Sequence, residues 1–178
     1  WVANTEARNL VRYEPALRGH FIDSRVTRID LGAQGTVTPF DLNPQIDYRV
    51  LPNPAALATA LSQPTGLEFS PDGRELFVAA FGTDRIGVVD PTNGSVTARI
   101  EVGPVRGTQV DSRNMRGPRG MAHHPTQKRL YVLNRLGNTI SVVDTQARRE
   151  LREVPMPFDP MAQALREGRG FLYDAKLS

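Results

Sequence analysis

Short runs of alternating apolar and polar residues dominate the chain, and most runs end at a turn signal. Within residues 64–102 four such runs occur, at about 66–70, 75–80, 85–90 and 96–102. Pro71-Asp72-Gly73 follows the first run, and Thr92-Asn93-Gly94 follows the third. Alternation with a period of two is typical of half-buried strands, and Asp-Gly or Asn-Gly pairs favour tight hairpins. The pattern therefore predicts four antiparallel strands in this segment.

The same pattern occurs again further along the chain. Residues 64–100 align without gaps on residues 118–154, with identities that include Pro64/Pro118, Gly66/Gly120, Leu76/Leu130, Val89/Val143 and Asp90/Asp144. Part of a third copy opens the chain, where residues 1–4 match 131–134 and residues 26–30 match 140–144. Tandem units of four short strands are typical of propeller blades. We therefore predict an all-β protein, a β-propeller of four-stranded antiparallel blades that is present as an incomplete set of about three blades.

The predicted blades occupy about 1–40, 64–103 and 118–157, and three insertions interrupt them at 5–24, 41–63 and 103–117. In a propeller, the connections between blades open on the same face as the connection between the second and third strands of each blade. The three insertions and the tail that follows the last blade are therefore expected on one face. Loops carry function more often than the scaffold beneath them, so this face is the expected docking surface.

Two short helices are predicted outside the blades. Asn53 can cap a helix that has Pro54 in its first turn and residues 55–61 as its body. A second helix is expected from Asp159 to about Arg166. Residues 158–178 as a whole are expected to form this helix and a linker toward a further C-terminal domain.

The composition excludes several classes of protein. The longest apolar runs, at 76–81 and 55–61, are far shorter than the roughly 18 residues of a membrane-spanning helix. The chain has no cysteine, which excludes disulfides, thiolate metal sites and covalent haem attachment within these residues. A formal net charge of +3 is too small to indicate nucleic acid. We therefore expect no cofactor on this chain, no nucleic-acid partner and no membrane span.

No catalytic motif is present, so no catalytic or metal-ligating residue is predicted. The most strongly charged insertion instead offers candidate binding residues, with four arginines between positions 103 and 119. These are Arg106, Arg113, Arg116 and Arg119, with Arg18 and His20 expected beside them on the same face. Guanidinium groups suit a carboxylate, a haem propionate or an acidic partner, and a solvated loop is the alternative interpretation.

Other residues invite a metal interpretation that their predicted positions do not favour. His20 falls in the first insertion, whereas His123 and His124 end a strand beside a hairpin on the opposite face, so the three are not expected to meet. We expect one of the latter pair to be packed and one exposed. Asp30, Asp90 and Asp144 each end the third strand of a blade, where an aspartate typically accepts hydrogen bonds from the following turn.

Tyr131-Val132-Leu133-Asn134, followed by residues 138–144, resembles the YVTN-repeat β-propellers. Residues 77–80 and 1–4 match the tetrapeptide more loosely, and the resemblance covers most of residues 1–154. It implies the fold and says little about activity. The tail adds a narrower resemblance: residues 168–178 are similar to the stretch that joins the propeller of some secreted YVTN-like proteins to a c-type cytochrome domain of the di-haem peroxidase kind. The alternative is an ordinary tail with a glycine-rich stop after a helix.

The resemblance implies a noncatalytic scaffold of a secreted or periplasmic redox protein, docking a c-type haem domain or electron-transfer partner on its loop-rich face. Haem c is then expected only in a further C-terminal part. Two alternatives stay open: a surface adhesion or protein-interaction propeller, and part of a metal- or quinone-dependent propeller oxidoreductase. Because a propeller needs at least about four blades to close, we also expect further blades as partners, from a parent chain or from self-association.

Overall fold

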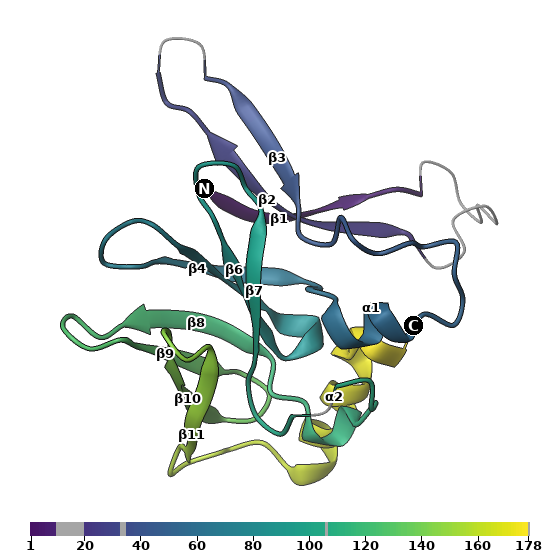
Figure 1. Ribbon diagram of the computed structural model, residues 1–178. Helices are drawn as coiled ribbons and strands as arrows, with labels where there is room; N and C mark the ends of the chain where they lie inside the picture. Colours follow the sequence, from purple (N-terminus) through teal and green to yellow (C-terminus); the bar gives the residue numbers. More distant parts are fainter. Residues whose placement is uncertain (10–19, 33–34, 106, 178) are drawn as a thin grey trace.

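The computed structural model describes residues 1–9, 20–32, 35–105 and 107–177. Its strands form three antiparallel sheets that follow one another along the chain (Figure 1). Blade 1 contains β1 (Val2–Ala7), β2 (Ile22–Ile29) and β3 (Val37–Asp41). Blade 2 contains β4 (Pro64–Phe69), β5 (Leu76–Ala80), β6 (Arg85–Val89) and β7 (Val96–Glu101), and blade 3 contains β8 (Pro118–His123), β9 (Arg129–Asn134), β10 (Thr139–Asp144) and β11 (Arg149–Pro155). This arrangement confirms the prediction of an all-β propeller with about three blades.

The apolar core lies between neighbouring blades rather than within one sheet. Strand β5 shows why, because successive side chains of a strand point to opposite faces. Phe77 and Ala79 face blade 3, whereas Leu76, Val78 and Ala80 face blade 1, and all five are fully buried. The cluster toward blade 3 also contains Ile86, Val88, Ile100, Val102, Leu130, Val132 and Val143, and the cluster toward blade 1 also contains Val26, Leu42, Leu61 and Val89.

Glycine at the start of the innermost strand permits the blades to approach. A Cβ at Gly66 would lie 1.9 Å from the carbonyl oxygen of Arg119 in blade 3. Such a contact is impossible, so only glycine allows β4 and β8 to come this close. Of the two glycines that match in the repeat, Gly66 is therefore required by the packing of blade 2 against blade 3.

The three aspartates that end the third strands bind their own turns, as predicted. Asp30 Oδ1 accepts a hydrogen bond from the Gly32 N–H, Asp90 Oδ1 from the Thr92 N–H, and Asp144 Oδ1 from the Gln146 and Ala147 N–H groups. Hydrogen bonds from the Thr92 side chain and backbone lower the pKa of Asp90, and hydrogen bonds from Ala147 and Gln146 lower that of Asp144. These carboxylates stabilise hairpins.

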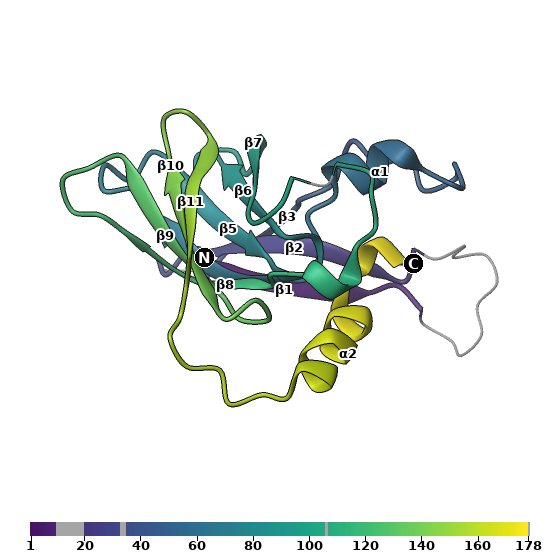
Figure 2. The ribbon, with the colours of Figure 1, turned by 90° about the horizontal axis from the view of Figure 1, so that it is seen from below.

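The helices and long connections gather at one end of the strands. Figure 2 shows α1 (Pro54–Thr59) and α2 (Gln163–Tyr173) there, opposite the hairpin turns that join β8 to β9 and β10 to β11. The described connections also contain three short 3₁₀ helices: η2 (Phe81–Thr83), η3 (Ser112–Asn114) and η4 (Ala175–Leu177). We call this end, formed by α1, η2 and η3, the loop-bearing face, and α2 and η4 pack on it. Among the described helices, none has the length and apolar content to span a membrane.

The first helix has the predicted cap, and two other predicted boundaries need correction. Asn53 Oδ1 accepts a hydrogen bond from the Ala56 N–H at 3.0 Å, and Pro54 is the first helical residue. Residues 5–24 were expected as an insertion, but β1 continues to Ala7 and β2 begins at Ile22, because backbone pairing extends through polar residues that break the apolar alternation.

The second helix was expected from Asp159 to about Arg166, and it instead occupies Gln163–Tyr173. It begins later because Asp159 Oδ1 accepts a hydrogen bond from the Met161 N–H and so holds a turn before the helix. It ends later because Gly170 does not stop it. Gly170 is buried against the loop-bearing face, where the packing compensates its low helix propensity.

Candidate functional site

The insertion between blades 2 and 3 is fixed at its end by Asp84. This residue lies in the left-handed region (φ 53°), directly before β6, and is buried. Its Oδ1 accepts hydrogen bonds from the N–H groups of Arg116 (3.0 Å) and Gly117 (2.8 Å). A hydrogen bond to an ionised group is stronger than one between neutral groups, so this carboxylate holds the end of the insertion on blade 2.

Arg85 connects both long insertions to the same blade. Its side chain is 1% exposed, and its guanidinium donates hydrogen bonds to the carbonyl oxygens of Ala60, Leu57 and Gly107 and to a carboxylate oxygen of Glu101. The first two carbonyls come from α1 and its C-terminal end. Three of these four contacts start from Nη2, which carries two N–H groups, so two of the acceptors share one N–H. Sequence reasoning missed this role, since a single arginine at a strand start carries no distinctive signal.

The insertion is also bound to blade 3. Arg116 Nη2 lies 2.9 Å from Glu153 Oε2 and its Nε lies 2.6 Å from Oε1, while Nη1 donates to the Asn114 carbonyl oxygen. The Gly103 N–H donates to Glu150 Oε2 at 2.5 Å. Burial raises the pKa of Glu150 above its usual value, and the neighbouring Glu153 acts in the same direction. The loop is therefore a well-connected part of the scaffold.

The C-terminal segment 163–177 packs onto this insertion. A Cβ at Gly170 would lie 2.0 Å from the carbonyl oxygen of Ser112, so α2 touches η3 backbone to backbone. The Ser112 hydroxyl donates a 2.8 Å hydrogen bond to Asp174 Oδ2, and both residues are buried. Asp174 Oδ1 accepts from the Lys176 N–H. The bond between Ser112 and Asp174 joins residues that are 62 positions apart in the chain.

Apolar and cationic contacts complete this anchor. The Tyr173 ring packs against the cluster of Phe81, Met115 and Leu136, edge-on to Phe81 with ring centroids 5.4 Å apart. Lys176 is 6% exposed, and its ammonium group donates to the Gly107 carbonyl oxygen at 3.2 Å. The same oxygen accepts from Arg85, so one carbonyl joins blade 2 and the tail. Residues 170–176 are therefore docked rather than free.

The predicted binding residues occupy different positions on this structure. Arg113 is exposed in η3, Arg119 is exposed on β8, and Arg116 is engaged by Glu153. Arg18 and Arg106 lie outside the described residues. Arg113 and Arg116 lie in the same insertion, while His20 contacts Asp23 and Tyr48 next to blade 1. The binding role of all six residues stays a prediction.

His20 forms a separate cluster next to β2. Its Nε2 lies 2.6 Å from Asp23 Oδ1, and its ring stacks on Tyr48 with centroids 3.4 Å apart and an interplanar angle of 6°. Burial, together with Asp41 and Asp23, raises the pKa of Tyr48 to about 12. Burial also acts to raise the pKa of Asp23, but hydrogen bonds from Arg8 and His20 outweigh it and the pKa is lowered. An ionised Asp23 therefore orients the imidazole.

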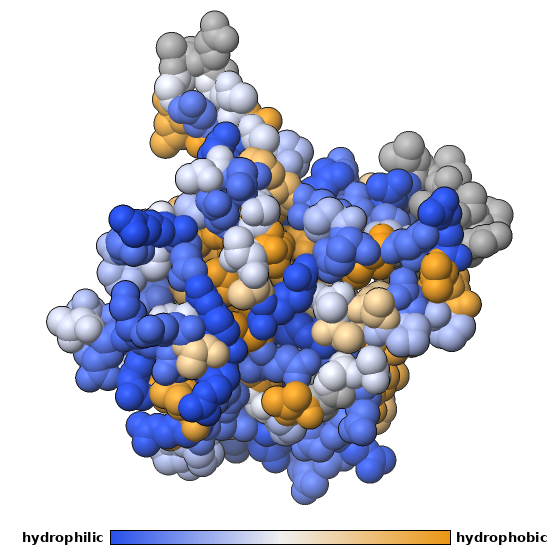
Figure 3. All heavy atoms as spheres, viewed as in Figure 1, coloured by the Kyte–Doolittle hydropathy of each residue, from blue (hydrophilic) through white to orange (hydrophobic). Residues whose placement is uncertain are grey.

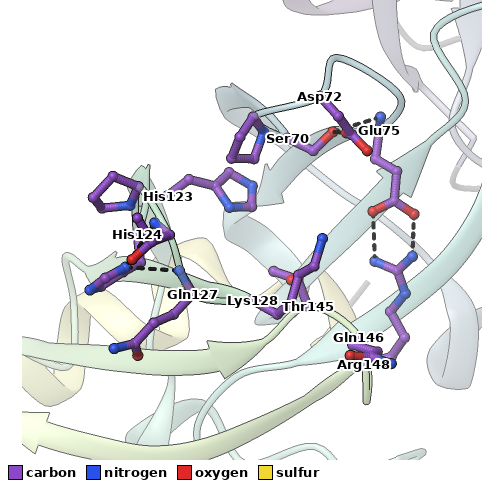
Figure 4. A pocket seen from close by; sticks show the side chains of 13 residues that line it. Ser70, Asp72, Glu75, His123, His124, Gln127, Lys128, Thr145, Gln146 and Arg148 are labelled. Atoms are coloured by element: carbon purple, nitrogen blue, oxygen red, sulfur yellow. Dashed lines mark hydrogen bonds and ion pairs between the residues drawn. The ribbon is translucent and has the colours of Figure 1, made fainter.

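The other two histidines lie at the opposite end of the strands. They line a pocket of about 440 Å³ between the hairpin turns of blades 2 and 3, together with Glu75, Lys128 and Arg148 (Figure 4). Arg148 donates to both carboxylate oxygens of Glu75 across this pocket.

His123 packs edge-on to Phe77 and has a pKa lowered by burial. The sequence predicted that one histidine of this pair would pack and the other would be exposed. His124 is instead half-buried, and its Nδ1 accepts hydrogen bonds from the N–H groups of Thr126 and Gln127. Within the part of the chain that the structure describes, no group of three or more His, Cys, Asp or Glu residues could hold a metal ion.

Hydrophobic residues reach the surface over blade 3, where Figure 3 shows them over β10 and β11. The side chains of Leu151 and Val154 in β11 are 36% and 39% exposed. An apolar sheet face left uncovered is typical of an interaction surface.

A family model and several solved structures are similar to this chain. A family model described as lactonase, 7-bladed β-propeller, matches residues 17–167. The chain is similar to hydrazine synthase from Kuenenia stuttgartiensis, with 28% identity and a TM-score of 0.45 over 55% of this chain and 24% of that chain. It is similar to AztD from Citrobacter koseri, with 14% identity and a TM-score of 0.50 over 79% of this chain and 33% of that chain. It is also similar to virginiamycin B lyase from Staphylococcus aureus, with 16% identity and a TM-score of 0.48 over 76% of this chain and 38% of that chain.

The comparison with curated proteins finds no match. The likeness to AztD concerns the fold alone, and the chain spans between 24% and 38% of the length of the three solved structures. The family match, in contrast, extends over most of the chain and agrees with its blade architecture. The chain therefore belongs to the lactonase, 7-bladed β-propeller family.

Proposed function

We propose that the chain is a noncatalytic propeller scaffold in a secreted or periplasmic redox protein, and that its loop-bearing face docks a c-type haem domain or an electron-transfer partner. The observation that carries the proposal is the anchoring of the C-terminal segment on this face, through buried Gly170, Asp174 and Lys176. These residues fall within the stretch 168–178, which resembles the join between a propeller and a haem domain.

The anchor supports docking for a physical reason. A domain tethered after this segment begins its path at the loop-bearing face, at a high effective concentration relative to that face. Even a weak contact between the two would then be populated. Asp84, Arg85 and Glu153 hold the 103–117 insertion beneath the segment, so the surface is prepared before a partner arrives.

Charge supports the same role. Arg113 is exposed in η3, which contacts α2 directly, and Arg119 is exposed on β8. Guanidinium groups at the rim of an interface attract carboxylates, including haem propionates, and mainly increase the rate of association.

A charge-reversal series in a longer protein that continues beyond residue 178 tests the proposal. Arg113→Glu and Arg119→Glu together should slow electron transfer to the haem centre, or binding of the partner, by about tenfold at low ionic strength. Arg74→Glu is the matched control, because this arginine is 85% exposed in the β4–β5 hairpin at the other end of the strands. Arg116 is left unchanged, since its reversal would break the ion pair with Glu153.

Four results would count against the proposal. Unchanged rates after both reversals would remove the docking role of the arginines, and equal losses with Arg74→Glu would show a general charge effect. Absence of a haem c absorption spectrum in the longer protein would remove the redox role. Lactone hydrolysis by that protein would favour the activity named in the family description over a scaffold.

A further inference from the structure

A small pocket lies where the turn between β9 and β10 meets the segment that precedes α2. Its volume is about 90 Å³, and its charged lining consists of three arginines and one carboxylate: Arg135, Arg166, Arg169 and Asp159. Arg135 belongs to the turn, whereas the other two arginines belong to α2. Three guanidinium groups against one carboxylate give the pocket a formal charge of +2.

Hydrogen bonds fix the turn that carries Arg135. The N–H groups of Arg135 and Leu136 each donate at 2.9 Å to a carbonyl oxygen of the 103–117 insertion. On the other side of the turn, the Asn138 side chain donates to the Phe158 carbonyl oxygen at 3.0 Å. The turn is therefore bound to the segment that joins β11 to α2, which Figure 2 shows as an open loop. Contacts within the protein alone hold the walls of the pocket.

The carboxylate in the pocket orients one of the arginines. Asp159 Oδ2 lies 2.5 Å from Arg166 Nη1, and Asp159 Oδ1 accepts a hydrogen bond from the Met161 N–H at 3.0 Å. Both carboxylate oxygens thus have a partner. The ion pair uses one of the five N–H donors of a guanidinium, so Arg166 is held in place and can still donate to another acceptor.

The other two guanidinium groups have no carboxylate partner. Arg169 is half-buried, and its Nη1 lies 3.6 Å from the sulfur of Met161, which is a weak acceptor. Arg135 is exposed. In the part of the chain that the structure describes, no acidic side chain forms an ion pair with either residue. Two cations close together without an anion repel each other, so this arrangement favours binding of a negatively charged group.

The volume and charge of the pocket define the class of ligand. Pockets for drug-sized ligands measure about 300–1,000 Å³, so this pocket is too small for one. It has room for a few water molecules, each of which occupies about 30 Å³ in the liquid, and so for one group of similar bulk. A phosphate or sulfate group matches the charge of +2 as a dianion and offers oxygens in several directions. A single carboxylate carries half that charge and offers two oxygens in one plane.

A further propeller blade does not suit this pocket. The described blades contact each other through apolar side chains, such as Phe77 and Val132 on one side of β5 and Val78 and Val26 on the other. An apolar surface over the three arginines would remove water from their N–H groups without replacing its hydrogen bonds. The pocket therefore differs in chemistry from the uncovered faces of the blades.

We propose that this pocket binds the tetrahedral dianion of a phosphate or sulfate group. Arg166 and Arg169 donate hydrogen bonds to the anion from α2, and Arg135 donates from the β9–β10 turn. Guanidinium groups suit this task because their N–H donors form a fixed fork that fits such oxygens. The bound anion links α2 to blade 3. The site goes beyond the proposed function and does not depend on it.

Calorimetric titration of the chain with inorganic phosphate at low ionic strength tests the proposal. We expect saturable binding at one site, about tenfold tighter than the binding of acetate. Arg135→Gln and Arg169→Gln should each weaken phosphate binding about tenfold, because each removes a hydrogen bond to a charged group. Arg135→Lys keeps the charge without the fork and should weaken binding less than Arg135→Gln does.

Arg152→Gln is the matched control. It removes the same charge from an exposed position on β11 that does not line the pocket, and it should change the affinity less than twofold. Circular dichroism of each variant checks the fold. Because Arg135 is exposed, its substitutions should leave the fold intact and test the site even where Arg169→Gln unfolds the tail.

Titrations with sulfate and with glycerol phosphate identify the source of the anion. Equal binding of phosphate and glycerol phosphate would assign the pocket to the end group of a larger molecule, and binding of the inorganic ions alone would assign it to a free ion. Acetate that binds as tightly as phosphate would overturn the proposed class of ligand. Equal weakening by Arg152→Gln, or no saturable binding of any of the dianions, would overturn the site.

Discussion

Blades 2 and 3 have nearly the same pattern and different surroundings. In blade 2 the residues that face blade 3 are at most 1% exposed; they are Phe77, Ala79, Ile86, Val88 and Ile100. Their equivalents in blade 3 are Tyr131, Leu133, Ile140, Val142 and Val154, which face away from blade 2, and only Val142 is buried. Burial of the same apolar set therefore depends on the next blade and not on the set itself.

The other faces of the two blades differ in chemistry. In blade 3, Asn134 donates hydrogen bonds to Thr139 and Ser141, whose hydroxyls lie near Glu153 and Glu150. Blade 2 has Ala80 and Gly87 at the positions of Asn134 and Ser141. There Leu61 occupies the space, since a Cβ at Gly87 would lie 2.6 Å from its Cδ1. A polar network therefore fills this position in blade 3, and the Leu61 side chain from the 41–63 insertion fills it in blade 2.

The largest expected effect comes from removing an aromatic ring at equivalent positions. Phe77→Ala should lower the free energy of unfolding of the 178-residue chain by about 3–5 kcal/mol, because it empties the core between blades 2 and 3. Tyr131→Ala should cost less than half as much, because its ring is only partly covered. Chemical denaturation measures both losses. Equal losses of unfolding free energy in this chain would contradict the comparison. In a longer protein in which blade 3 is covered, the two losses should become equal.

Next in size is the pair of equivalent glycines. Gly66→Ala should cost about 1–3 kcal/mol or more, since the new methyl group would meet the Arg119 carbonyl oxygen and separate the blades. Gly120→Ala should change stability by less than about 0.5 kcal/mol, because the nearest atom to a Cβ there is 3.8 Å away. Denaturation curves of the two variants decide this. A large loss from Gly120→Ala would mean that blade 3 already has a neighbour in solution.

Two glycines of α2 extend the comparison to the tail. Gly170→Ala should release residues 163–177 from the loop-bearing face, at a local cost of about 1–3 kcal/mol, because the methyl group would collide with the Ser112 carbonyl oxygen. Gly168→Ala should instead stabilise the helix by about 0.5–1 kcal/mol, since its side is open. Limited proteolysis of the tail should therefore become faster in the first variant and slower in the second. The same rate of proteolysis in both variants would show that the contact between Gly170 and Ser112 does not hold the tail.

The smallest expected effect concerns the polar network of blade 3. Because the pKa of Glu150 is raised in the folded state, the folded protein holds this proton to higher pH than the unfolded chain does. Its contribution to stability is therefore lost as the pH rises from about 4.5, the ordinary value, through the raised pKa.

Glu150→Gln should remove this part of the pH dependence and make the protein slightly more stable at neutral pH. Urea denaturation at several pH values between about 4 and 7 measures it. Glu153→Gln is the control and should destabilise the protein, because it breaks the ion pair with Arg116. An unchanged pH dependence in Glu150→Gln would show that this carboxyl does not contribute to it.

The blades could be predicted from sequence because each strand carries its own signal of alternation and turn residues. The aspartate turns and the Asn53 cap are equally local, and both were predicted. The anchoring contacts were not, because Arg85, Ser112 and Asp174 act on partners far away in the chain. Arg116 was predicted as a binding residue from charge alone, and the sequence gives no indication that Glu153 lies beside it.

The position of Leu61 has a consequence for how this chain could change during evolution. Duplication or exchange of residues 64–102 alone would carry Ala80 and Gly87 without the side chain that fills the space beside them. It would also leave the guanidinium of Arg85 without the carbonyl groups of residues 57 and 60. Blade 2 and residues 42–63 therefore have to be exchanged together, so recombination breakpoints should be tolerated after β3, which ends at Asp41, and avoided at residue 63.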